Sequence, residues 1–211
     1  MIKEIKEIKI ITLGDTGVGK TSIINRIYRN EFNDKEISTI GIQHHHPIVK
    51  QYAKRNLTLE LSFIDTAGQE RYLDAIPKLY IRNSHIVLLV FCDLLSLETL
   101  KDRWINYYKE HANIKDSKFI VVANKSDLFG EERIKIKELG EEFAEKIDAF
   151  FIICSAKSKD NMDNLLSHII TESKRLIDGN KIETKTKKYF EIDDAPFTEC
   201  YSLIIKKCCP F

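Results

Sequence analysis

The sequence contains no long hydrophobic segment. Its longest uninterrupted apolar run, Ile86 to Cys92, is far too short to cross a bilayer. The N-terminal stretch, MIKEIKEIKI, alternates charged residues with isoleucines and lacks the apolar core of a secretory signal peptide. Both absences argue against a membrane-spanning or secreted chain, and we expect a soluble protein of the intracellular type.

An excess of charge of either sign is also absent. The 211 residues include 33 lysines and arginines against 32 aspartates and glutamates, so no overall field would recruit nucleic acid. Apolar residues make up 43% of the chain, which is enough to form a hydrophobic core. The length suits one domain of ordinary size with additional terminal residues.

Cysteine is scarce, with five residues, and its spacing excludes a disulfide framework. Cys92 and Cys154 lie in apolar runs, where buried free thiols are expected. The other three cysteines fall in the last dozen residues, and no CxxC pair with zinc spacing is present.

Strand and helix patterns alternate along most of the chain. The segments 85–93 and 118–125 are continuous apolar runs, which are typical of strands covered on both faces. Further strands are predicted at 9–14, 57–65 and 150–155, and helices at 22–30, 97–112, 131–147 and 161–178. This alternation predicts a doubly wound α/β domain with a largely parallel sheet, whose ligand lies at the carboxyl ends of the strands.

The character of the sequence changes after Gly179. Residues 180–211 mix lysines and acidic residues with scattered aromatics and show no sustained period. We therefore expect one domain over residues 1–179 and a flexible tail over 180–211, rather than a second domain.

The strongest motif is GDTGVGKT, Gly14 to Thr21, which follows a predicted strand and opens a predicted helix. Its glycines let backbone N–H groups surround phosphate oxygens at the positive end of the helix. Lys20 would neutralise the β and γ phosphates, and the Thr21 hydroxyl would bind Mg²⁺. The alternative is a glycine-rich turn with a chance GKT, but three further motifs agree. The predicted phosphate-binding residues are Asp15, Thr16, Gly17, Val18, Gly19, Lys20, Thr21 and Ser22.

The second motif, IDTAGQE at 64–70, ends a predicted strand. Asp65 can hold the metal ion through a water, and the Gly68 N–H can bind the γ-phosphate. Gln69 can orient an attacking water, so Gln69, Lys20 and Gly68 are the candidate catalytic residues.

Two further motifs suit the recognition of guanine. NKSD at 124–127 closes a strand, and the Asp127 carboxylate can accept from both the N1–H and the 2-amino group of guanine, which adenine cannot supply. SAK at 155–157 follows the last strand, where backbone N–H groups can meet the guanine O6. Four motifs in this order, each at the end of a strand, predict a site that binds and hydrolyses GTP.

These motifs, together with STIG at 38–41, LYIRNSH at 79–85 and the terminal cysteine pair, resemble the small GTPases of the Ras superfamily over roughly residues 5–178, and the Rab family most of all. The resemblance implies the P-loop NTPase small-GTPase fold, a six-stranded mixed sheet flanked by five helices, with the second strand antiparallel. It implies that Thr39 binds Mg²⁺ together with Thr21 and Asp65. It also assigns Phe32 to packing against the guanine, and the residues Asn124, Lys125, Asp127, Ser155, Ala156 and Lys157 to reading the base.

The resemblance also implies a mode of action. A Rab-like protein binds GTP or GDP with Mg²⁺, hydrolyses GTP slowly and regulates vesicle traffic. The intrinsic rate of a related switch protein is ~10⁻⁴ s⁻¹, and a partner's arginine raises it about 10⁵-fold. No arginine is obviously placed to act within the chain, so a GTPase-activating protein is implied. An exchange factor, a GDP-dissociation inhibitor and effectors are implied as well, at the cytoplasmic face of an intracellular membrane in exchange with the cytosol.

The chain ends in KKCCPF. One interpretation is prenylation of both Cys208 and Cys209, as in Rabs ending in CCxx. The other is a C-a-a-X signal in which only Cys208 is modified, as in a Ras- or Rho-type signalling GTPase. Two lipid chains would anchor the protein firmly, whereas one would need help from Lys206 and Lys207.

Several positions depart from the Rab pattern. Ile64 replaces a tryptophan of the effector surface, and Glu36 stands where a tyrosine often covers the nucleotide. These departures leave open a GTP-binding scaffold that has lost hydrolysis. A P-loop kinase or ATPase is a further alternative, against which NKSD argues.

The run His44, His45 and His46 is a further departure, because Rabs commonly carry a phenylalanine at the first of these positions. In a strand, His44 and His46 would share one face and His45 the other, so the three cannot converge as metal ligands. Pro47 suits an edge strand. The run is either a solvated edge or an altered, pH-sensitive partner surface.

Overall fold

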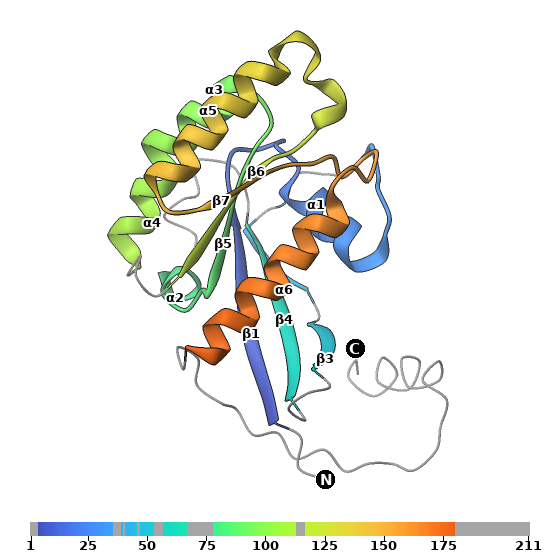
Figure 1. Cartoon of the computed structure of the whole chain (residues 1–211), viewed down its shortest axis with the longest axis vertical. Coiled ribbons are helices and arrows are strands. Elements are labelled where there is room, and N and C mark those ends of the chain that lie inside the picture. The colour runs from blue at the N-terminus through green and yellow to red at the C-terminus, as the bar shows by residue number, and fades with distance from the viewer. Residues whose placement is uncertain are drawn as a thin grey trace.

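The computed structural model describes residues 4–35, 39, 41–45, 47–52, 57–66, 78–112 and 117–179 (Figure 1). Four predicted features lie outside these residues: Gly68 with Gln69, Glu36, His46, and the tail with Cys208 and Cys209. Among the described helices, none is both long and apolar enough to cross a membrane.

One mixed sheet forms the centre of the fold (Figure 1). The strands lie in the order β2-β4-β1-β5-β6-β7, and β3 also pairs with β4. The strand bounds are β1 Glu4–Leu13, β2 Ile42–His44, β3 Ile48–Tyr52, β4 Leu57–Thr66, β5 Ile86–Phe91, β6 Lys118–Ala123 and β7 Phe150–Ile153. The pairs β1–β4, β1–β5, β5–β6 and β6–β7 are parallel.

The edge beside β4 is occupied by two short antiparallel strands in succession. β2 pairs with the end of β4, from Ile64 to Thr66, and β3 pairs with its beginning, from Leu57 to Leu61. β2 ends at His44 and β3 begins at Ile48, so the two strands share one position beside β4, and Pro47 just before β3 cannot donate a ladder hydrogen bond. Counted this way, the described part of the sheet has six strand positions, and the antiparallel second strand is confirmed.

Helices cover both faces of the sheet (Figure 1). α1 Lys20–Arg29 packs beside α6 Met162–Asp178 on one face. The other face carries α2 Lys78–Arg82, α5 Arg133–Lys146 and a continuous helical body made of α3 Leu94–Thr99, the π-helical turn η2 Leu100–Trp104 and α4 Ile105–His111. Within the described residues these are five helical bodies, as predicted, with short 3₁₀ turns at Ser126–Leu128 and Gly130–Glu132.

The central strands bury both of their faces. In β5, Ile86, Leu88 and Val90 face the cluster with α1 and α6, and the alternate residues Val87, Leu89 and Phe91 face the cluster with the remaining helices. This two-sided burial explains the continuous apolar runs, because neither face is left for polar side chains.

Two sequence expectations are corrected by the fold. β1 starts at Glu4 rather than at residue 9, because Glu4 to Ile11 pair along the whole of β4. Cys154 is a buried free thiol as predicted, whereas the free thiol of Cys92 is only half-buried. Burial raises the pKa of both thiols, to about 12 and about 11, so neither is a reactive thiolate.

Candidate functional site

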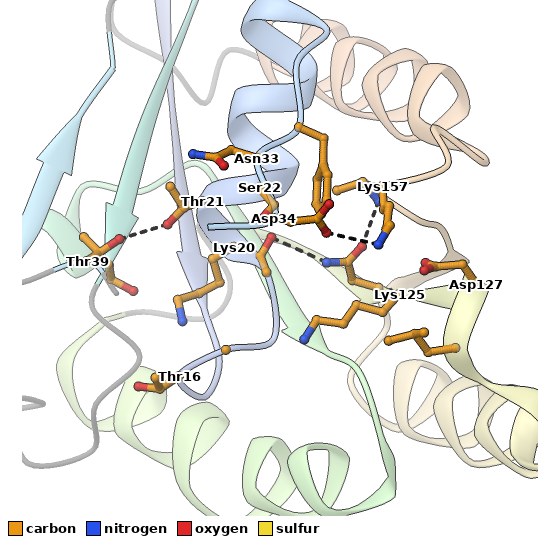
Figure 2. Close-up of a pocket in the computed structure, with 17 residues that line it drawn as sticks. Thr16, Lys20, Thr21, Ser22, Asn33, Asp34, Thr39, Lys125, Asp127 and Lys157 are labelled. Carbon is orange, nitrogen blue, oxygen red and sulfur yellow. Dashed lines mark hydrogen bonds and ion pairs between the residues drawn. The ribbon is translucent and has the colours of Figure 1, made fainter. Parts of the chain in front are cut away.

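A pocket of about 300 Å³ lies at the carboxyl ends of the strands (Figure 2). It gathers most of the residues that the sequence motifs single out, and it adds Asn33, Asp34, Thr66 and Leu128. The predicted residues that line it are Thr16, Gly17, Gly19, Lys20, Thr21, Ser22, Phe32, Thr39, Asn124, Lys125, Asp127, Ala156 and Lys157. Four others, Asp15, Val18, Asp65 and Ser155, do not line the pocket.

Two glycines shape the phosphate loop. Gly14 has φ +145°, and a Cβ there would lie 2.1 Å from the Val90 carbonyl oxygen. Gly19 has φ +93°, and a Cβ there would lie 2.3 Å from the Asn124 amide nitrogen. The loop can therefore pass this close to β5 and to Asn124 only with glycine at both positions.

Lys20, the first residue of α1, lies folded back over this loop. Its ammonium donates to the carbonyl oxygens of Gly14 and Asp15, each at 2.8 Å. The side chain is only 5% exposed, and burial lowers the pKa of Lys20 to about 8, although the Asp65 and Asp15 carboxylates act to raise it. A buried ammonium whose described hydrogen-bond partners are both carbonyl oxygens is ready to bind phosphate oxygens.

Three oxygen-bearing side chains from separate segments meet beside Lys20. The Thr21 hydroxyl lies 2.6 Å from the Asp65 carboxylate and 2.9 Å from the Thr39 hydroxyl, which itself lies 3.3 Å from Asp65. Asp65 is fully buried, and the Thr12 hydroxyl donates to its other oxygen at 3.2 Å.

This donor set fits Mg²⁺, which is usually held by one or two carboxylates together with substrate phosphates and waters. No described group of three His, Cys, Asp or Glu side chains could hold a metal ion instead. Thr21, Thr39 and Asp65 are thus brought together as the sequence analysis expects.

Asn124 connects the two loops that flank the base side of the pocket. Its amide donates to the Val18 carbonyl at 2.9 Å, and its side-chain oxygen accepts from the Ala156 N–H at 3.1 Å. Val18 thus contributes a carbonyl to the loop scaffold rather than a surface to the pocket.

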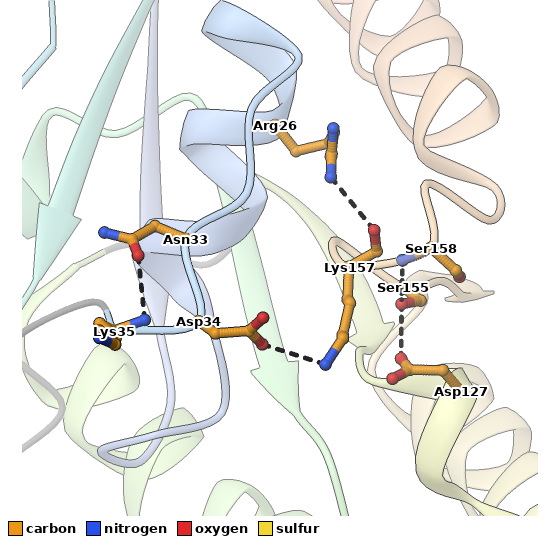
Figure 3. A network of polar contacts seen from close by, with 8 residues as sticks. All are labelled: Arg26, Asn33, Asp34, Lys35, Asp127, Ser155, Lys157 and Ser158. Atoms are coloured by element: carbon orange, nitrogen blue, oxygen red, sulfur yellow. Dashed lines mark hydrogen bonds and ion pairs between the residues drawn. The ribbon is translucent and has the colours of Figure 1, made fainter.

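Ser155 holds the Asp127 carboxylate through a hydrogen bond. It is fully buried, and its hydroxyl donates to the Asp127 carboxylate at 2.5 Å while accepting from the Ser158 N–H at 3.0 Å (Figure 3). The structure thus places Ser155 as a support for the carboxylate that would read guanine.

Two residues that contact the loops of the pocket are not found by the motif analysis. Asp34 pairs with Lys157 across the mouth of the pocket at 3.0 Å (Figure 3). The Lys157 ammonium also lies 5.9 Å from the centre of the Phe32 ring. Arg26 of α1 donates to the carbonyls of Ala156 and Lys157 at 2.7 and 3.1 Å. Arg26 therefore ties the base-recognition loop to α1. No local pattern marks it, because its partners lie 130 and 131 residues further along the chain.

The histidine run is only partly described. The His45 N–H donates to the Phe63 carbonyl at 3.2 Å, and its ring lies 5.3 Å from the ring of Tyr28 in α1. His45 thus packs toward α1, away from the nucleotide pocket. His46 and the side chain of His44 lie outside the described residues, so the partner-surface hypothesis stays a prediction.

Ile64, the other described departure from the Rab pattern, belongs to the hydrophobic core. Its side chain is 2% exposed and packs in the hydrophobic cluster between the sheet and the helices on the α2 side. Within the described residues its side chain is a core contact rather than a surface one. Gly68 and Gln69 follow β4 outside the described residues, and their catalytic roles stay predictions.

Comparison with known proteins agrees with the site. A sequence model of the Ras family matches residues 9–175. Ras-related protein Rab11E of Lotus japonicus is 32% identical over 182 residues, which cover 83% of this chain and 78% of the relative. Ras-related protein Rab-11A of Dictyostelium discoideum is 36% identical over 166 residues (78% and 74%), and Ras-related protein SEC4 of Saccharomyces cerevisiae is 34% identical over 176 residues (82% and 78%).

The match to the Ras family begins within β1, covers the other six described strands in full, and ends near the end of α6. It includes the phosphate loop, the oxygen cluster around Asp65 and the two loops that hold Asp127. The chain therefore belongs to the Ras superfamily of small GTPases and is a GTP-binding protein of the Rab type.

Proposed function

We propose that the protein is a GTP-hydrolysing switch of vesicle traffic, loaded by an exchange factor and turned off with the help of a GTPase-activating protein. The observation that carries this proposal is the convergence of Lys20, Thr21, Thr39 and Asp127 on one pocket, with the buried Asp65 carboxylate in contact with both threonine hydroxyls. The names of its relatives, Rab11E, Rab-11A and SEC4, support the traffic role.

Each residue of the proposed site has a distinct task. Lys20 binds the β and γ phosphates, and the phosphate-loop N–H groups surround their oxygens. Thr21, Thr39 and Asp65 would hold Mg²⁺, which neutralises charge on the phosphate oxygens when bound. Asp127 accepts from the guanine edge, Phe32 packs on the base, and Gln69 orients the attacking water.

Thr39 makes the site a switch. Its hydroxyl contacts both Thr21 and Asp65, so this side chain links the segment that carries it to the proposed Mg²⁺ site. Loss of the γ-phosphate would release that segment, and effectors would distinguish the two states.

Single-turnover hydrolysis tests the enzymatic part. Wild-type protein loaded with GTP and Mg²⁺ should form GDP at ~10⁻⁴ s⁻¹, and Gln69→Leu should slow this about tenfold or more. An unchanged rate in Gln69→Leu would favour the alternative of a GTP-binding scaffold without catalysis. Tighter binding of ATP than of GTP would instead revive the kinase or ATPase alternative.

The lipid anchor is tested in cells with the full chain. Cys208→Ser, Cys209→Ser and the double variant are compared for their distribution between membrane and cytosol, with Cys200→Ser as the matched control in the same tail. Two prenyl groups predict partial release by either single variant and full release by the double variant. A normal distribution of Cys209→Ser would favour the single C-a-a-X signal on Cys208.

A further inference from the structure

The single tryptophan of the chain contacts the phosphate loop directly. Trp104 is fully buried, yet its indole N–H donates to the Asp15 carboxylate at 2.7 Å. The two residues are 89 positions apart, so the bond links the helical body α3–η2–α4 to the loop between β1 and α1. A hydrogen bond to a carboxylate is roughly twice as strong as one between neutral groups.

Asp15 connects the Trp104 hydrogen bond to the backbone of the phosphate loop. Its carboxylate is turned away from the pocket toward Trp104, while its carbonyl oxygen accepts from the Lys20 ammonium at 2.8 Å. The contacts therefore run without a gap from Trp104 through Asp15 to Lys20.

The helix is irregular at this point. Trp104 ends the turn Leu100–Trp104, where the Ile105 N–H bonds to the Leu100 carbonyl five residues earlier. Such π-helical turns occur frequently at functional sites. Tyr108, one turn further on, is equally buried, but its hydroxyl bonds to Ser84 and Ser117, away from the pocket.

We propose that Trp104 is a positioning residue for the phosphate loop. By holding the Asp15 carboxylate, it fixes the backbone over which Lys20 lies, and it thereby couples the retention of the nucleotide to the packing of the α3–η2–α4 body. The proposal rests on the proposed nucleotide site, because it concerns how that site is held in shape.

The test is a double-mutant cycle on the rate of GDP dissociation. Trp104→Phe keeps a buried aromatic ring but removes the donor, and Asp15→Ala removes the acceptor. Each should accelerate the release of a fluorescent GDP analogue by about tenfold, the effect expected for one hydrogen bond to a charged group. The double variant should be no faster than the faster single variant, because both changes break the same contact.

The control separates positioning from general stability. Tyr108→Phe removes one buried polar group from the same helical body and should lower the urea midpoint without accelerating GDP release. If Trp104→Phe also lowers the urea midpoint but leaves the release rate unchanged, its role is structural and the proposal is overturned. Additive effects in the cycle would overturn it as well.

If Trp104→Phe does not fold, a second measurement on a different variant tests the proposal. Asp15→Asn leaves the tryptophan in place, so the single indole N–H resonance of ¹⁵N-labelled protein can be followed with and without GDP. Accelerated release together with a shifted indole resonance supports the proposal, and wild-type kinetics overturn it. Failure of the wild-type protein to bind any guanine nucleotide would instead refute the proposed function itself.

Discussion

At the scale of single residues, the charged form of Lys20 is destabilised by burial until a phosphate binds. An ammonium that is 5% exposed and bonded to two carbonyls is poorly neutralised, and burial lowers its pKa to about 8. Phosphate oxygens supply the negative charge that this position lacks, so binding of the nucleotide should restore its ordinary preference for the protonated form.

Proton uptake on nucleotide binding follows from this pKa. Because the pKa of the free lysine is lowered to about 8, its neutral form becomes more populated as the pH rises above neutrality, whereas the lysine bound to phosphate stays charged. Binding of Mg²⁺–GDP should therefore take up a fraction of a proton that increases between about pH 7 and pH 9, and the affinity should fall as the pH rises. Calorimetry in two buffers of different ionisation enthalpy measures the uptake, and an uptake that does not change with pH would contradict the assignment.

Arg26 is the second residue whose role can be tested. It donates to the carbonyls of Ala156 and Lys157, so Arg26→Gln should loosen the base-recognition loop and accelerate GDP release by about fivefold, the value of one partly exposed charged hydrogen bond. Arg29→Gln is the matched control, because Arg29 is exposed on the same helix. Equal release rates in the two variants would show that the hydrogen bonds of Arg26 do not affect the release of the nucleotide.

At the scale of elements, the body α3–η2–α4 depends on how its first turn is capped. Asp93 accepts from the Ser96 N–H at 2.7 Å, and the Ser96 hydroxyl bonds back to the Asp93 N–H at 3.1 Å. This capping box satisfies N–H groups that no helical carbonyl can reach. It starts the helix at Leu94, three residues before the amphipathic pattern indicates.

Asp93→Ala should therefore destabilise the domain by about 1 kcal/mol at neutral pH, measured as a lower urea midpoint. Burial acts to raise the pKa of Asp93, but hydrogen bonds from Ser96 and Cys92 outweigh it and hold that pKa below 3.8. The stabilisation is accordingly present above pH 3.8 and is lost as the pH falls through the lower folded pKa. Asp102→Ala, at an exposed position in the same helical body, should change the midpoint little at either pH.

At the scale of the whole molecule, two hydrophobic clusters hold the sheet between its helices, and the pocket lies where the loops from both sides meet. Trp104 bonds to the phosphate loop from one layer, and Arg26 bonds to the loop that carries Ala156 from the other. A ligand in the pocket would therefore stabilise both layers together.

Guanine nucleotide should raise the free energy of unfolding of the entire domain. Mg²⁺–GDP at 100 times its Kd should add about 2.7 kcal/mol, because the ligand binds only the native state. The same concentration of Mg²⁺–ATP should add almost nothing, since adenine cannot satisfy Asp127. Removal of Mg²⁺ with EDTA should reduce the GDP effect, and equal thermal shifts with ATP and GDP would contradict the base assignment.

Much of the fold could be predicted from the sequence, because its signals are local. The buried strands β5 and β6 are continuous apolar runs, and GDTGVGKT specifies its own turn through Gly14 and Gly19. The division of the edge beside β4 between β2 and β3 was less predictable. Pro47 signals an edge, but the pairing of β2 and β3 with opposite ends of β4 depends on the length of that strand.

The sequence by itself determined the class of the protein and most of the residues of its pocket, since strand ends in a parallel sheet bring successive motifs to one edge. Only the tertiary structure decided what holds those residues in place. The bonds from Trp104 to Asp15, from Arg26 to Ala156 and from Lys157 to Asp34 join segments 89, 130 and 123 residues apart. Such contacts depend on how helices pack against the sheet, and no spacing within a single segment encodes them.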